Sequence, residues 1–72
     1  MFKCPVCYYP YIRNDPAKQL YDICPSCGIE YGYEDAGLEG PAYYHKQLRK
    51  RWIAKGRPWW FKGHEPAGDW NP

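Results

Sequence analysis

The sequence contains no long apolar run. No uninterrupted apolar stretch approaches the ~20 residues of a membrane-spanning helix, so the chain is not expected to cross a membrane. The pattern of a secretory leader is also missing, because Met1, Phe2 and Lys3 run directly into the first cysteine pair. We therefore expect a cytoplasmic protein with reduced thiols and no membrane partner.

The sequence also lacks a closely spaced nucleophile and base. Its only serine, Ser26, lies between two cysteines, and the carboxylates of Glu34, Asp35 and Glu65 have no evident partner. Catalysis by a nucleophile or by a general acid and base needs such groups within hydrogen-bond reach of one another. We expect that the protein is not an enzyme.

What the sequence does contain is two Cys-Pro-x-Cys pairs. They are separated by 16 residues and use every cysteine of the chain, Cys4, Cys7, Cys24 and Cys27. This spacing is typical of a structural zinc site with four thiolate ligands. Iron bound as in rubredoxin would use the same four residues, and a secreted chain could pair them as disulfides. The short gap between the pairs argues against iron, and the missing leader argues against disulfides.

Two histidines could add to such a site. We expect neither His45 nor His64 to bind the metal, because four thiolates already complete a tetrahedral coordination sphere. The chain of 72 residues is near the size at which apolar burial alone stabilises a domain. Structural zinc contributes roughly 10–16 kcal/mol of apparent binding free energy. The domain is therefore expected to fold with metal and to be largely disordered without it.

The expected fold is one small metal-stabilised α+β domain. Its segments are a zinc ribbon (1–33), an acidic loop (34–40), a helix (41–56) and an aromatic irregular tail packed back on the ribbon (57–72). Residues 19–23 and 29–33 alternate polar and apolar side chains, which predicts two antiparallel strands. Gly28 follows the second cysteine pair, where a turn with positive φ is needed.

The helix has start and stop signals and one apolar stripe. Pro41 suits the first helical position and Gly56 a C-terminal stop, which bounds the helix at about 41–55. Tyr44, Leu48 and Trp52 recur every four residues and predict the face packed against the ribbon. Lys46, Arg49 and Lys50 lie away from that stripe and are expected to face water.

The charge is divided unevenly along the chain. Residues 1–40 hold three basic and six acidic residues, whereas residues 41–72 hold seven basic and two acidic ones. The basic half also carries tryptophans that are either core or binding surface. The candidate partner-binding residues are Lys46, Arg49, Lys50, Arg57, Trp59, Trp60 and Lys62. We expect a protein-interaction adaptor, with nucleic-acid binding through this basic half as one alternative and rubredoxin-like iron electron transfer as another.

The chain resembles a group of small bacterial zinc-ribbon proteins in the segments Tyr21–Gly32 and Leu48–Ile53 and in the ending Trp70-Asn71-Pro72. This group is similar to the cysteine-rich CPCC family and mostly of unassigned function. The resemblance implies a zinc-ribbon fold with the four cysteines as ligands, and no activity. The chain departs from the pattern twice. Tyr8 replaces a glycine, so a different turn is expected there, and Ser26 stands where CPCC proteins have a further cysteine.

Overall fold

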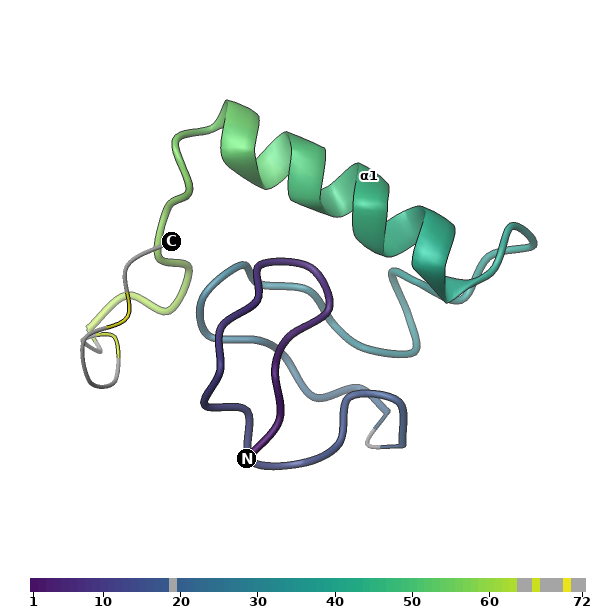
Figure 1. The fold of residues 1–72 in the computed structure, drawn as a ribbon, viewed down its shortest axis with the longest axis horizontal. Coiled ribbons are helices and arrows are strands. Elements are labelled where there is room, and N and C mark those ends of the chain that lie inside the picture. Colours follow the sequence, from purple (N-terminus) through teal and green to yellow (C-terminus); the bar gives the residue numbers. More distant parts are fainter. Residues whose placement is uncertain (19, 64–65, 67–69, 71–72) are drawn as a thin grey trace.

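Two cysteine-bearing loops and one helix make up the fold. The computed structural model describes residues 1–18, 20–63, 66 and 70. The helix, α1 (Pro41–Ala54), lies across one side of the N-terminal half (Figure 1). After α1 the chain turns back along the same N-terminal half. Within the described residues, no helix has the length and apolarity needed to cross a lipid bilayer.

The first cysteine loop, residues 4–8, is closed by backbone hydrogen bonds. Phe2 and Ile12 form an antiparallel bridge at its base, with N–H to O=C distances of 2.8 and 2.9 Å. Inside the bridge, the Cys4 N–H donates to the Tyr9 carbonyl at 2.8 Å, and the Tyr8 N–H donates to the Cys4 carbonyl at 2.9 Å. These bonds curl residues 4–8 so that both thiols turn inward. We call this segment the first knuckle.

The second knuckle, residues 24–28, repeats the two inner hydrogen bonds of the first knuckle, on a bridge of a different register. Ile23 and Glu30 form the bridge at its base. The Cys24 N–H donates to the Ile29 carbonyl, and the Gly28 N–H donates to the Cys24 carbonyl, both at 2.9 Å. The two knuckles therefore share one backbone geometry, although their sequences agree only at the cysteines and the proline.

The two predicted strands are present only as this bridge. The part of 19–23 and 29–33 that the structure describes pairs antiparallel, as expected, but no described residue lies in a strand longer than an isolated bridge. Tyr21 and Gly32 have left-handed backbones, with φ of 69° and 79°, which interrupt extended structure on both sides. The β part of the expected ribbon remains a prediction.

The predicted helix is confirmed. Gly40, with φ of 88°, precedes Pro41 at the first turn, and α1 ends at Ala54. The stop signal acts as expected, because Gly56 has φ of 92° and its N–H donates to the Ile53 carbonyl at 3.0 Å. Such a left-handed residue closes the last turn and directs the chain away from the helix axis.

The buried core joins α1 to both knuckles. Its members are Cys4, Val6, Cys7, Tyr9, Ile12, Cys24, Ile29, Tyr31 and Trp52. Trp52 is buried, as the apolar stripe predicts, and its indole N–H donates to the Pro58 carbonyl at 2.9 Å. Leu48 packs against this core while half-buried. Tyr44 is also only half-buried, because it packs against Gly37 of the acidic loop rather than against a knuckle.

The segment after α1 covers the second knuckle. The N–H groups of Trp60 and Phe61 donate to the carbonyls of Ser26 and Pro25, both at 2.9 Å. Trp59 points to the core, with its ring 5.4 Å from that of Tyr9. The two adjacent tryptophans thus have different roles, because Trp60 stays about half exposed.

Candidate metal centre

The thiols of Cys4, Cys7, Cys24 and Cys27 form one cluster. Their sulfur atoms all lie within 4.8 Å of one another, and all four cysteines are free. The Sγ atoms of Cys4 and Cys27 are 3.8 Å apart, and those of Cys7 and Cys24 are 3.7 Å apart. A tetrahedron with metal–sulfur distances of about 2.3 Å has edges of about 3.8 Å. The cluster therefore has the size of a four-thiolate metal site.

Backbone geometry turns the sulfurs toward one another. The Val6 N–H donates to the Cys4 sulfur at 3.4 Å, as knuckle amides do toward thiolates. Gly28 has φ of 82°, as expected after the second pair. The different turn expected at Tyr8 is wrong, because Tyr8 takes the same left-handed conformation, with φ of 68°. A side chain in that region costs about 1–2 kcal/mol, and the knuckle imposes it despite the cost.

The four thiols do not titrate alike. Hydrogen bonds from Cys24 and then Cys27 lower the pKa of Cys4 and of Cys7. Hydrogen bonds to Cys24, Cys4 and Cys7, together with burial, raise the pKa of Cys27. A cation bound among the four sulfurs stabilises all of them as thiolates, so metal binding releases the remaining thiol protons. The cluster is thus a set of soft, negatively charged donors suited to zinc or iron.

Tyr31 closes the cluster on the side of the core. Its side chain is almost fully buried, and its hydroxyl lies beside the sulfurs of Cys4 and Cys24. Burial, followed by the charge of Cys24, raises the pKa of this phenol well above its usual range. The phenol therefore stays protonated beside the sulfurs. Together with Val6 and Ile29, it keeps water away from the site.

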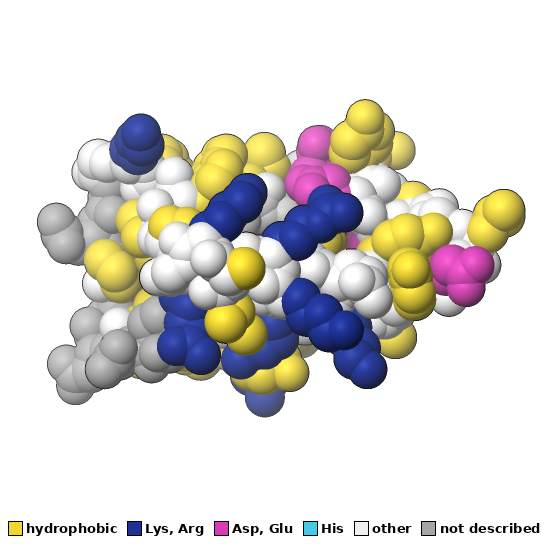
Figure 2. Space-filling model, turned by 90° about the horizontal axis from the view of Figure 1, so that it is seen from above, with side chains coloured by type: hydrophobic (Ala, Val, Ile, Leu, Met, Phe, Trp, Pro, Cys, Tyr) yellow, Lys and Arg dark blue, Asp and Glu magenta, His cyan; other side chains and the backbone are white. Residues whose placement is uncertain are grey.

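The candidate partner-binding residues do not share one surface. Lys46, Arg49 and Lys50 line a groove of about 570 Å³ between α1 and the first knuckle. Trp59, Trp60 and Lys62 line a different groove, beside the second knuckle. Arg57 is exposed and lies in neither. Figure 2, which looks down on α1, shows basic side chains on both sides of the helix with apolar side chains between them.

One of these residues has a structural contact that the sequence did not suggest. Arg49 was expected to face water, but this is wrong. Its guanidinium lies 3.9 Å from the centre of the Tyr8 ring, and one of its N–H groups donates to the Val6 carbonyl at 3.1 Å. Arg49 therefore fastens α1 to the first knuckle through charge and a hydrogen bond.

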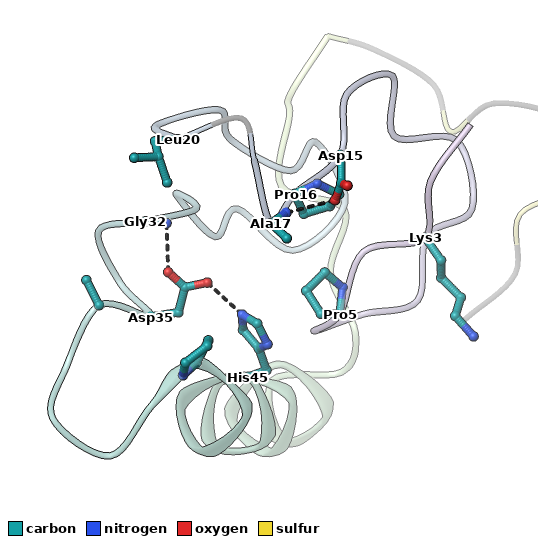
Figure 3. Close-up of a pocket in the computed structure, with 11 residues that line it drawn as sticks. Lys3, Pro5, Asp15, Pro16, Ala17, Leu20, Gly32, Asp35 and His45 are labelled. Atoms are coloured by element: carbon teal, nitrogen blue, oxygen red, sulfur yellow. Dashed lines mark hydrogen bonds and ion pairs between the residues drawn. The ribbon is translucent and has the colours of Figure 1, made fainter.

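Histidine takes no part in the described cluster. The His45 Nε2 atom lies 2.6 Å from an Asp35 carboxylate oxygen, and the other oxygen of Asp35 accepts the Gly32 N–H at 2.7 Å (Figure 3). This pair ties α1 to the loop before it and borders a cavity of about 520 Å³. The prediction for His64 lies outside the described residues.

Sequence reasoning missed the roles of Tyr8, Tyr31, Asp35 and His45. Tyr8 was noted only as a departure from a pattern, and Asp35 as a carboxylate without a partner. The only available signal for Tyr31 was its place as an apolar residue after the second knuckle. The contacts Tyr8–Arg49 and Asp35–His45 join separate segments of the chain, and no local pattern encodes them.

Comparisons of the chain with protein-family models, with curated proteins and with solved structures find no match.

Proposed function

We propose that the protein is a non-enzymatic binding module whose fold is held by one structural zinc ion. The observation that carries this proposal is the buried cluster of Cys4, Cys7, Cys24 and Cys27, whose sulfur separations of 3.7 and 3.8 Å match a tetrahedral thiolate site. The four thiolates leave no open coordination position for water or substrate. Closed sites of this kind are structural rather than catalytic.

The position of the cluster supports a structural role. The cysteines form part of the core, and α1 packs on that same core through Trp52. A cation at this place would hold both knuckles and, through them, the helix. Among the described residues few other side chains are buried, so metal binding and folding are expected to be one equilibrium.

A protein-interaction adaptor is the form of module that we favour. Large apolar side chains remain exposed around the metal-held core, among them Tyr21, Tyr33 and Leu38. Groups of such residues are common where small domains dock onto larger proteins. Nucleic-acid binding has less support, because the basic residues lie on both sides of α1 and Trp59 packs into the core.

The proposal also covers the family to which the chain is related and the cellular compartment in which it works. The two cysteine knuckles followed by a helix are what a relative of the small bacterial zinc-ribbon proteins, similar to the CPCC family, would have. Free thiols that bind a metal fit a reducing compartment such as the cytoplasm.

Metal analysis of the purified protein tests the central claim. One zinc per chain is expected, with the helical circular-dichroism signal lost when a strong chelator removes it and recovered when zinc returns. Iron at one per chain, visible by its colour, would replace the proposal with a rubredoxin-like electron-transfer protein. A chain that keeps its helix and melting temperature without metal would refute the structural role.

A further inference from the structure

The groove between α1 and the first knuckle has charge of one sign. It is lined by Pro5, Tyr8, Ala42, His45, Lys46, Arg49, Lys50 and Ile53, without a carboxylate. Lys46 and Lys50 are exposed and make no ion pair with any described residue. The Lys3 amine also lies nearby, 5.0 Å from the centre of the Tyr8 ring. By contrast, the groove beside the second knuckle mixes Glu34 with its basic residues.

The rest of this lining is apolar and partly exposed. Ile53 exposes 39% of its surface and Tyr8 45%, so the groove offers apolar area beside its cations. A ligand that fits must therefore bring carboxylates or phosphates together with apolar groups. That combination is found in acidic peptide segments that contain apolar side chains.

The Tyr8 ring is poorly placed to stack on a nucleobase. The Arg49 guanidinium already lies over the ring at 3.9 Å, and it is held there by its bond to Val6. The other aromatic ring that the structure describes in the groove lining, the His45 imidazole, is held by the Asp35 carboxylate at 2.6 Å. Proteins that bind single strands without sequence preference rely on free aromatic faces. This groove therefore suits a peptide better than a nucleic acid.

The second knuckle shows how an extended chain can seat on a knuckle. There, Phe61 donates its N–H to the Pro25 carbonyl, and Trp60 donates to the Ser26 carbonyl. At the first knuckle the counterpart of Pro25 is Pro5, whose carbonyl accepts no hydrogen bond from the described residues. Among the described residues, the acceptor that the second knuckle uses to hold the segment after α1 is thus unused at the first knuckle.

We infer that this groove binds an extended acidic segment of a partner protein. Carboxylates of the segment would meet Lys46, Arg49 and Lys50, while one of its apolar side chains would lie against Ile53. An N–H group of its backbone would donate to Pro5. The inference rests on the proposed function, a metal-held binding module, and gives that module a surface and a class of partner.

The test uses the full zinc-loaded chain and two matched charge reversals, on α1 and at its C-terminal end. K46E/K50E changes the groove, and R51E/K55E makes the same change in net charge beside the other groove. All four side chains are exposed and have no described polar contact, so both variants should fold. Circular dichroism and zinc content verify that they do.

Three labelled probes of equal length are compared by fluorescence anisotropy. They are a peptide of alternating glutamate and leucine, the same peptide with glutamine for glutamate, and a mixed-sequence single-stranded oligonucleotide. We expect the glutamate peptide to bind and the glutamine peptide not to bind. K46E/K50E should weaken binding by roughly tenfold or more, since it places carboxylates against carboxylates. R51E/K55E should change the affinity by less than about threefold.

Other results overturn the inference. Equal losses in both variants would mean attraction to net charge alone. Tighter binding of the oligonucleotide, lost in K46E/K50E, would assign the groove to nucleic acid. If the folded, zinc-loaded protein does not bind the glutamate peptide, the groove is not a site for acidic segments, and the proposal of a metal-held module is unaffected. A chain that folds and binds the peptide without metal would refute the proposed structural role and leave the groove standing.

Discussion

The two knuckles have the same backbone but different covers. Each has a hydrogen bond from its first cysteine to the residue five positions on, and each has a left-handed residue directly after its second cysteine. The second knuckle is covered by the backbone of Trp60 and Phe61, whereas the first is covered by the side chain of Arg49. The same knuckle backbone is thus covered once by a backbone segment and once by a side chain.

The residue after each second cysteine reflects this difference. A Cβ atom at Gly28 would overlap the Trp60 ring, so the second knuckle needs glycine for space as well as for its φ of 82°. At the first knuckle a tyrosine occupies the corresponding position with 45% of its surface exposed, despite its φ of 68°. The second knuckle therefore excludes a side chain at this position, whereas the first accommodates one.

The largest effect is expected from replacing a metal-binding cysteine, and it should be the same in either knuckle. Cys4→Ser and Cys24→Ser should each abolish stable zinc binding and with it the helical signal, because the metal supplies roughly 10–16 kcal/mol. Zinc content and circular dichroism measure this. Ser26→Ala is the control, since it changes a buried side chain of the same loop whose hydroxyl has no described partner. Wild-type zinc content in either cysteine variant would contradict a shared site.

Trp52→Ala should have the next largest effect on stability, and it should affect the second knuckle most. Its ring is buried in the core, and its indole N–H holds the Pro58 carbonyl just before the segment that covers residues 24–28. A loss of about 3–5 kcal/mol in unfolding free energy is expected. Thermal unfolding at constant free zinc measures it. The matched control is Ile53→Ala, on the exposed side of α1, and equal losses in both variants would mean that Trp52 is not the anchor.

Gly28→Ala should destabilise the protein by an intermediate amount. The positive φ costs about 1–2 kcal/mol for any side chain. The methyl group would also overlap the Trp60 ring, and overpacking of this kind costs typically 1–3 kcal/mol. The double variant Gly28→Ala with Trp60→Ala should recover the stability that the overlap with the Trp60 ring costs. If the double variant is no more stable than the sum of the two single changes predicts, the contact between Gly28 and Trp60 is not the cause.

The metal cluster could be predicted from the sequence because all its residues lie in two short motifs. The helix could be predicted because its start at Pro41, its stop at Gly56 and the spacing of its apolar stripe are all signals within one short segment of the chain. The strands were overestimated, since alternation of polar and apolar residues does not reveal a left-handed residue such as Tyr21. The pairs Arg49–Tyr8 and His45–Asp35 depend on how α1 sits on the loops. That arrangement follows from packing, which no spacing rule describes.

The smallest expected effect concerns the first knuckle alone. At position 8, alanine and glycine are expected to differ mainly in the cost of the left-handed backbone, because the tyrosine there is 45% exposed, whereas a Cβ atom at Gly28 would overlap Trp60. Tyr8→Gly should therefore be more stable than Tyr8→Ala by only about 1 kcal/mol. The corresponding step at position 28 should be larger by the clash with Trp60. Thermal unfolding of the three variants at one free zinc concentration gives both differences.

Equal differences in stability between glycine and alanine at the two positions would mean that the knuckles are covered alike in solution. A larger difference at position 8 would mean that the first knuckle is the more tightly covered of the two. Either result would remove the structural reason for placing a partner at the first knuckle rather than at the second.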